Sequence, residues 1–430
     1  MLKKIGLALM ISLLLLRHET ASAFQEEEKG APPPIDSDAS PPLSFQFGPQ
    51  LSIGVQLHLG VLRRKNRDLE EALEDDQTRL SGRLDLAALI RPLESVELFS
   101  EFRFEERSLS RDGEGEVSRD RTGEVSKAYL LWKEVFPATQ IQIGRQRFKD
   151  SREWIYDENL DAVRLILRGD PIELQLSVSS NLVNPKKPED RIRNYIFYAL
   201  YQVAPKDEAA FYGIVRNDPT REDREPAFVG ISWKGKSIKD QRYWLEAASL
   251  SGNDGSKILR GYGWDIGWSS RFDYPMKPSV TIGYAFGSGD RNTEDRIDRN
   301  FQQTGLQDNQ GKWHGVTKFK YYGELFDPEL SNLKIWTAGL GATPFQKVSV
   351  DLVYHYYAQV EKAGRLRDTG IKADPSGEER NLGSEIDLIW GFRAMAQVQM
   401  EATSALFLPG SAFPSSERAF SQEFKMQILF

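Results

Sequence analysis

The stretch FQFGPQLSIGVQLHLGV, residues 45–61, decides the fold. Every odd-numbered residue in it, from Phe45 to Val61, is apolar, and every even-numbered residue is polar or glycine. A period of two places the apolar side chains on one face of a β-strand and the polar ones on the other. Soluble strands usually run ~5–6 residues, whereas a tilted strand that crosses a bilayer needs ~9–11. This alternation therefore predicts one long membrane-crossing strand over residues 45–61.

The same alternation recurs along the chain, and its apolar positions often carry tryptophan or tyrosine. The clearest repeats lie at residues 96–105, 172–179, 262–269, 280–287, 385–393 and 420–430. A soluble two-sheet sandwich also alternates, but it needs neither strands of this length nor so many aromatic residues on the apolar face. With the aromatic C-terminus Phe430, the pattern predicts an all-β fold: a transmembrane, antiparallel, up-and-down β-barrel of about 18 strands.

Short and long connections alternate between the predicted strands. Residues 91–95 and 204–208 are short, whereas 108–123, 288–316 and 360–382 are long. Outer-membrane barrels have short periplasmic turns and longer extracellular loops. We therefore expect both ends of the chain to lie in the periplasm of a bacterium, with the barrel in its outer membrane.

The N-terminus predicts export. Residues 1–23 combine Lys3 and Lys4, an apolar run over 5–16 and a small-residue cleavage site at Ala21-Ser22-Ala23. This is the pattern of a secretory signal peptide, and the apolar run is too short for a membrane anchor. Residues 24–43 are acidic and rich in proline, so we expect a flexible periplasmic lead-in. Residues 44–430 are expected to form one domain, the barrel.

Composition and motifs exclude several classes of function. The formal net charge of -7 argues against nucleic acid as a partner. The absence of cysteine excludes disulfides, thiolate metal sites and cysteine nucleophiles. The sequence has only four histidines and no metalloprotease, serine-hydrolase or phosphate-binding motif. We therefore expect no enzyme activity, no cofactor and no metal site.

Charged side chains on the polar strand faces are candidates for lining a pore. Rings of Arg or Lys suit anions, and rings of Asp or Glu suit cations. Arg83, Arg103 and Arg393 share the inward parity of their strands, but so do carboxylates such as Asp85 and Glu101. Most such charges are expected to pair within the wall. Only a cluster with an unpaired surplus of one sign would give selectivity.

The densest charged stretch is GRQRFKDSREWIYDENLDAVRLILR, residues 144–168. Arg145 and Arg147 share their parity with the apolar Ile143, which would point both arginines toward lipid. A strand that ends near Gly144 resolves this conflict, and the loop after it could then fold inward and narrow the pore. The pore-lining candidates are Arg83, Arg103, Arg145, Arg147, Arg152, Asp157, Asn159, Arg164, Lys320 and Arg393.

The other unusual stretch is the long polar loop over residues 288–332, which contains Trp313, Phe319, Tyr321 and Tyr322. A loop of this length is usually functional or disordered. Its aromatic residues fit a folded lid or a carbohydrate-facing surface, and plain packing of an outer loop fits equally well.

In these two segments the sequence resembles the bacterial alginate-export outer-membrane porin family. The resemblance covers roughly residues 45–430, and its motifs lie at 144–148, 152–159, 163–165, 303–307, 319–333 and 382–388. It implies an 18-stranded barrel through which an anionic uronate polymer leaves the periplasm by passive diffusion past an Arg/Lys-lined constriction. By motif position Arg147, Asp157 and Asn159 match pore-lining residues best, and Lys320 and Arg393 match less closely.

The implied partners are an anionic polysaccharide, the surrounding outer-membrane lipids and lipopolysaccharide, and a periplasmic export scaffold, with the barrel acting as a monomer. A general porin for uptake of small solutes is the alternative. The sequence departs from the family at residues 390–396, which join strands 16 and 17 where the best-known members carry a long plugging loop. We therefore expect no plug at that position, and a channel that is open or gated by another segment.

Overall fold

A computed structural model describes residues 39–70, 76–111, 117–182, 192–218, 224–395 and 397–430. The predicted signal peptide and the lead-in up to residue 38 lie outside these residues. Among the described residues, no helix has the length and apolar character needed to cross a membrane.

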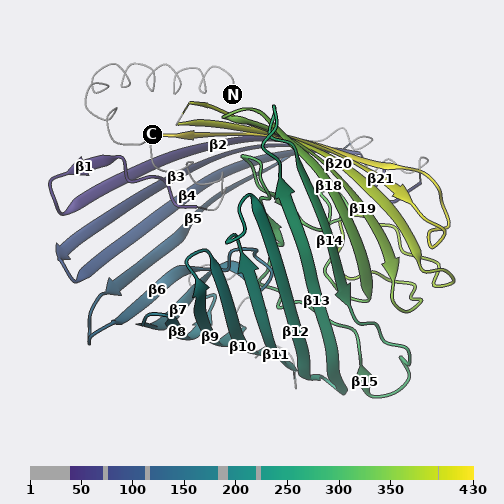
Figure 1. Cartoon of the computed structure of the whole chain (residues 1–430), viewed down its shortest axis with the longest axis horizontal. Helices are drawn as coiled ribbons and strands as arrows, with labels where there is room; N and C mark the ends of the chain where they lie inside the picture. Colours follow the sequence, from purple (N-terminus) through teal and green to yellow (C-terminus); the bar gives the residue numbers. More distant parts are fainter. Residues whose placement is uncertain (1–38, 71–75, 112–116, 183–191, 219–223, 396) are drawn as a thin grey trace. The chain divides into compact units, whose positions relative to one another are not determined.

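Eighteen long antiparallel strands in the described part of the chain form one closed sheet (Figure 1). The last strand closes the barrel by pairing with the first, with Ile428 opposite Leu57. The strands are β2 (Leu51–Lys65), β3 (Gln77–Leu93), β4 (Val96–Arg111), β5 (Val117–Trp132), β6 (Thr139–Lys149), β7 (Asp157–Arg168), β8 (Ile172–Ser180), β9 (Arg193–Ala204), β10 (Asp207–Asn217), β11 (Arg224–Gly235), β12 (Gln241–Asp254), β13 (Lys257–Arg271), β14 (Ser279–Gly287), β18 (Leu333–Phe345), β19 (Val348–Gln359), β20 (Asn381–Met395), β21 (Val398–Pro409) and β22 (Ala419–Leu429). The predicted barrel is confirmed.

The prediction of a single strand over residues 45–61 is wrong at its beginning. A turn at residues 48–50 separates a short strand, β1 (Phe45–Phe47), from β2. Gly48 adopts a left-handed backbone with φ of 68°, which glycine tolerates because it has no Cβ. β1 therefore folds back and pairs with β2, with Phe45 opposite Ile53.

The strands alternate between the outer and the inner face of the barrel as predicted. On β4, Phe102 is 47% exposed on the outside, whereas its neighbour Glu101 is completely buried inside. Asp85 of β3 also points inward and lies opposite Arg103 of β4. The outer band is apolar because it faces lipid, and every backbone group within the sheet can pair with a neighbouring strand.

Short turns lie at the end of the barrel that also holds the C-terminus, and most long connections lie at the other end. β20 ends at Met395 and β21 begins at Val398, so these two strands, the sixteenth and seventeenth, are closely joined as expected. The prediction of a long loop over residues 108–123 is wrong. β4 and β5 continue through the described part of this region and stay paired, with Arg107 opposite Asp120.

Two connections contribute most of the loop side chains to a core inside the barrel. They are residues 150–156, between β6 and β7, and residues 288–332, between β14 and β18, and we call them the inner segments. The second contains three short strands, β15 (Ile297–Asp298), β16 (Gln310–Gly311) and β17 (Phe319–Lys320). Side chains of both segments join inward-facing wall residues in one hydrophobic core. This core occupies part of the lumen and so determines where a passage remains.

Candidate functional site in the barrel lumen

The hairpin of β6 and β7 bends into the lumen because β6 separates from β5 near Gly144. β6 pairs with β5 only over Ile141–Arg145 but with β7 along its whole length. Gly144 has a φ of 119°, and a Cβ at this position would collide with the backbone of Ala128. The expectation that the strand ends near Gly144 is wrong, since β6 continues to Lys149. The expected inward fold of the following loop is present.

Arg147 joins the inner ends of the two hairpin strands. Its Nε and Nη2 atoms donate to the two carboxylate oxygens of Asp157 at 2.6 and 2.7 Å. Such a bidentate pair is both strong and geometrically specific. Nearby, the Asn159 amide donates to Ser126 Oγ at 3.3 Å, and Arg145 Nε donates to the Ser126 carbonyl at 3.2 Å. These four predicted residues attach the hairpin to itself and to β5.

Arg152 and Arg164 lie within the packing of the lumen. Arg152 donates to Asp265 at 2.8 Å and lies between the rings of Trp244 and Tyr321, at 4.3 and 4.0 Å from their centroids. Although burial opposes it, the Asp265 carboxylate raises the pKa of Arg152 above its usual value. Arg164 stacks on a ring of the hairpin, that of Phe148, at 3.7 Å. Arg152 thus holds the first inner segment in place, and Arg164 packs within the hairpin.

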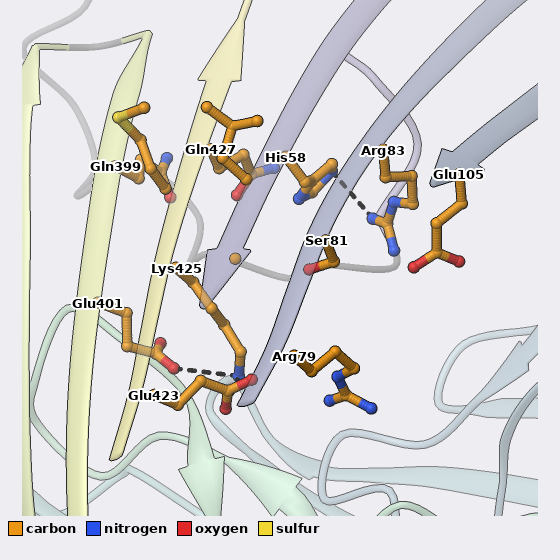
Figure 2. Close-up of a pocket in the computed structure, with 13 residues that line it drawn as sticks. His58, Arg79, Ser81, Arg83, Glu105, Gln399, Glu401, Glu423, Lys425 and Gln427 are labelled. Atoms are coloured by element: carbon orange, nitrogen blue, oxygen red, sulfur yellow. Dashed lines mark hydrogen bonds and ion pairs between the residues drawn. The ribbon is translucent and has the colours of Figure 1, made fainter. Parts of the chain in front are cut away.

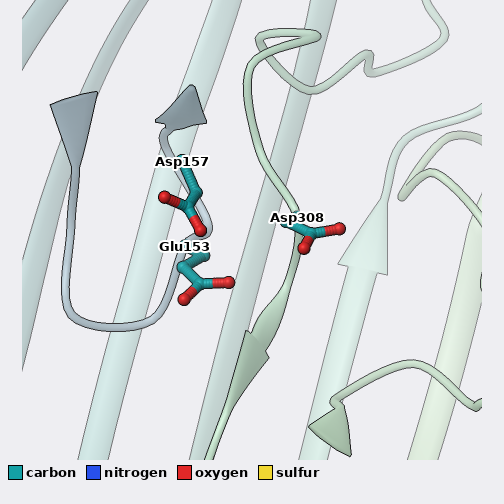
Figure 3. Close-up of side chains that lie close together, drawn as sticks. All are labelled: Glu153, Asp157 and Asp308. Carbon is teal, nitrogen blue, oxygen red and sulfur yellow. The ribbon is translucent and has the colours of Figure 1, made fainter. Parts of the chain in front are cut away.

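Three carboxylates meet where the two inner segments touch. Oxygen atoms of Glu153, Asp157 and Asp308 lie within 4.8 Å of one another (Figure 3). Cationic side chains already bind two of them: Lys149 and Lys318 contact Glu153, and Arg147 contacts Asp157. Because these cations balance the carboxylates, we interpret the cluster as an ion-pair network that connects the two inner segments.

The remaining predicted residues also point inward and have polar partners. Arg83 and Arg103 flank Asp85, with their Nε atoms at 3.1 and 3.0 Å from its oxygens. Lys320 forms an ion pair with Asp327 inside the second inner segment. Arg393 Nη2 donates to the carbonyl of Val316, on the same segment, at 3.3 Å. The structure therefore brings all ten candidates into or against the lumen, but it distributes them over several separate contacts.

The aromatic residues of the second inner segment are core residues, which answers the question that the sequence left open. Trp313, Phe319, Tyr321 and Tyr322 are each at most 6% exposed. The segment is also attached through its backbone, since the N–H groups of Leu325 and Phe326 donate to the Glu385 carboxylate at 2.7 Å each. These rings pack within the lumen and do not form an exposed carbohydrate surface.

The inner segments leave free space beside the first and last strands of the barrel. A cavity of about 220 Å³ is lined from β2, β3, β4, β21 and β22, and Figure 2 shows its polar side chains. A smaller adjoining cavity of about 40 Å³ reaches from this wall to Lys318 and Lys320 of the second inner segment. Both cavities share Lys425, which pairs with Glu401 at 3.5 Å and Glu423 at 2.9 Å. Charge here is mixed and largely balanced.

A second large cavity, of about 480 Å³, has a clear excess of positive charge. It lies at the end with the short turns, and Glu208 is the one carboxylate in its described lining. Its cationic lining residues are Arg152, Lys206, Lys234, Lys236, Arg242 and Lys312. Within the described chain, Lys236, Arg242 and Lys312 form no ion pair with a carboxylate. We call these three residues the basic cluster.

The surroundings of the basic cluster carry a positive potential. Burial and the charges of Arg393, Arg242 and Lys236 lower the pKa of Lys312 to about 8. Burial, together with Arg242 and Arg271, lowers the pKa of nearby His314 to about 4. Both pKa shifts follow first from burial, which disfavours the charged form, and then from the cations that are already close.

Sequence reasoning missed this cluster. A signal existed in the stretch KGKSIKDQR, residues 234–242, which holds four basic residues and one acidic residue. Lys312, however, reaches the cluster only because the second inner segment folds into the barrel, where its carbonyl accepts a hydrogen bond from Arg242 at 3.1 Å.

The closed strand wall, the apolar outer band and the polar lumen define an outer-membrane β-barrel of the porin type. Solved porin structures of Pseudomonas aeruginosa share this fold at low sequence identity. The structure of OpdQ matches with a TM-score of 0.59 at 9% identity, covering 88% of this chain and 98% of that one. The outer membrane protein OprD matches with a TM-score of 0.57 at 9% identity, covering 91% and 97%.

The chain belongs to the alginate export family, whose sequence pattern matches residues 49–426. It is 26% identical over 300 residues to the alginate production protein AlgE of Pseudomonas aeruginosa, covering 59% of this chain and 60% of that protein. It is 29% identical over 156 residues to AlgE of Azotobacter vinelandii, covering 31% and 32%. The matched regions thus span at most about 60% of the length of these relatives.

Proposed function

We propose that this barrel is a channel through which alginate, or a related uronate polymer, leaves the periplasm by passive diffusion. Membership of the alginate export family and the porin-type barrel support this proposal. The observation that carries it is the basic cluster of Lys236, Arg242 and Lys312, which lines a large cavity at the end with the short turns. This is the end at which a polymer from the periplasm would enter.

The physical basis is charge compensation. Each uronate residue carries a carboxylate, and moving it from water into a narrow protein lumen costs free energy unless a positive charge lies nearby. Unpaired Lys and Arg side chains supply that charge, whereas an arginine held in an ion pair supplies little. We further propose that the channel catalyses no reaction, works as a monomer among outer-membrane lipids and lipopolysaccharide, and receives polymer from a periplasmic scaffold.

The predicted site residues have different roles under this proposal. Arg145, Arg147, Arg152, Asp157, Asn159 and Arg164 shape the passage, because they fix the hairpin that folds inward. Arg83, Arg103, Lys320 and Arg393 line or brace the lumen. Selection for anions comes mainly from the basic cluster, because its charges are not matched by carboxylates in the described chain.

The test is a measurement of ion selectivity in planar lipid bilayers. We expect the triple variant Lys236→Gln, Arg242→Gln, Lys312→Gln to shift the reversal potential away from anion selectivity and to weaken current block by added alginate. A matched control replaces Lys239, Lys277 and Lys347 by Gln, since these exposed lysines also lie on short turns but do not line the cavity. Equal behaviour of the two triple variants would contradict the proposed role of the cluster.

A general porin for small solutes is the second candidate. The lining of the other cavity favours it, because three cationic side chains face three carboxylates there and such a lining suits neither sign of ion strongly. These residues are Arg79, Arg83 and Lys425, and Glu105, Glu401 and Glu423. Cation selectivity that added alginate does not alter would decide for this candidate and against polymer export.

A further inference from the structure

A short segment before the first strand lies inside the barrel. Residues 39–44, which we call the inner strap, cross the inner face of β2–β5 near the end with the short turns. The carbonyls of Pro41 and Pro42 lie directly over Gly54 of β2, where a side chain would collide with them. Farther along, Lys127 of β5 donates from Nζ to Ser40 Oγ at 3.1 Å.

The strap is held by a small apolar contact that is separate from the large core. Leu43 packs against Ala87, Leu89 and Phe99, with Tyr129 at the edge. These wall residues point into the lumen but are apolar, which distinguishes them from the polar side chains farther along the same strands. Their apolar character is explained by the strap that covers them.

The second attachment is formed by Gln46 of β1. Its amide donates to the Leu43 carbonyl at 2.9 Å, and its oxygen accepts from Ser52 Oγ at 2.7 Å. β1 itself pairs with β2 through three residues only. The strap is therefore the most lightly attached of the described elements in the lumen, because the inner segments are held by an extensive core. Elements with few buried apolar contacts open at low free-energy cost.

The inner strap lies beside a part of the lumen that remains free. Besides the cavity of the basic cluster, free space in the lumen lies along the wall formed by the first and last strands. The strap crosses this same wall at the short-turn end. A solute that follows the wall must pass it. The close join between β20 and β21, at Met395 and Val398, cannot supply a plug at this end.

We propose that the inner strap is a gate: docked, it narrows the passage at the periplasmic end, and its release widens that passage. The strap occupies the lumen through Ser40 and Leu43, and the wall beneath it stays intact when it leaves, since Lys127 keeps its ion pair with Glu101 at 3.1 Å. This inference rests on the barrel being a channel, but not on the polymer that it carries.

The experiment locks the strap with an engineered disulfide in the full-length protein. The chain has no cysteine, so the pair Leu43→Cys and Leu89→Cys is free of competing thiols. Single-channel conductance in potassium chloride is measured before and after reduction. We expect the oxidised protein to conduct less than half as well as the same protein after reduction, because conductance follows pore width. Each single-cysteine variant, treated in the same way, is the control.

A second variant lacks residues 39–44 but keeps β1. We expect it to conduct more than the wild type and to be insensitive to reductant. Conductance that does not change on reduction of the disulfide would overturn the gate, and so would a deletion variant that conducts like the wild type. Conductance measured in potassium chloride depends on the gate and not on whether alginate binds. A working gate with no effect of alginate would therefore count against polymer export and leave the gate standing.

Discussion

Two walls of the barrel differ in the polarity of their lumen faces. On β2–β5, which we call the open wall, inward side chains such as Asp85 and Glu101 are charged. On β9–β14, β18 and β19, which we call the covered wall, many inward side chains, such as Tyr212, Ile335 and Tyr357, are apolar and buried, and the buried charged ones, such as Glu246 and Asp265, are fewer. The inner segments cover the second wall and not the first. An apolar lumen face therefore indicates that another part of the chain covers it. The apolar patch under the inner strap is a second example.

The strongest way to break this comparison is to remove a core side chain from the second inner segment, which lies on the covered wall. Phe326 is completely buried and lies 5.1 Å from Phe407 and 4.5 Å from Tyr357, between ring centroids. We expect Phe326→Ala to destabilise the second inner segment by ~3–5 kcal/mol, as truncation of a buried phenylalanine does. The segment should then detach, and both proteolytic cleavage within residues 288–332 and channel conductance should increase.

The control for this prediction is Phe102→Ala on the open wall, where the side chain faces lipid. It should leave cleavage and conductance as in the wild type. The contrast between covered and open walls would be lost if the two variants behaved alike.

A smaller effect is expected for Arg147→Gln in the inward-folding hairpin. This variant removes the bidentate contact with Asp157, and hydrogen bonds to charged groups contribute roughly 1.5–3 kcal/mol. Hydrogen exchange of the first inner segment, residues 150–156, should become faster. Selectivity should change less than in the triple variant of the basic cluster, because Arg147 and Asp157 carry no net charge together.

Arg91→Gln is its matched control, since Arg91 pairs with Glu97 at 3.2 Å in a more exposed position near a short turn. Exposed ion pairs contribute little to stability. Equal acceleration of hydrogen exchange in both variants would show that the hairpin is held by something other than this ion pair.

The smallest expected effect is the pH dependence of anion selectivity. Because the pKa of Lys312 is lowered to about 8, its ammonium group is charged below that pH and loses its proton above it. Raising the pH from about 7 to about 9 removes most of one charge from the basic cluster, so anion selectivity measured by reversal potential should decrease modestly.

Lys312→Arg should abolish this dependence, because a guanidinium group stays protonated over that range. A reversal potential that does not change with pH in the wild type would contradict the prediction. So would an unchanged pH response in the Lys312→Arg variant.

Much of the fold could be predicted because the alternation of side chains is a local property. It placed Arg83, Asp85 and Arg103 on the inner face and showed that strands 16 and 17 are closely joined, and the structure agrees. The predictions of strand boundaries were wrong where a single glycine interrupts the alternation. Gly48 turns the chain within the first alternating stretch, and Gly144 bends β6 without ending it.

The covered wall also left a signal that only the structure explains. In β9, Tyr195, Ile196, Phe197 and Tyr198 are apolar on both faces, with Ile196 and Tyr198 buried and Tyr195 exposed on the outside. A strand that is apolar on both faces must be covered on both. Lipid covers one face, and the sequence alone does not show that inner segments cover the other.

By itself the sequence determined the class of the protein. When the polar face of a long alternating strand encloses a lumen, its apolar face can be buried only against lipid. This requirement applies to each strand separately, so the sequence of each strand shows it. The tertiary structure decided which charges remain unpaired. Arg152 meets Asp265 across more than a hundred residues of chain, whereas Lys312 meets Arg242 and no carboxylate within the described residues. Coulomb interactions depend on distance in space, and only the folded chain determines those distances.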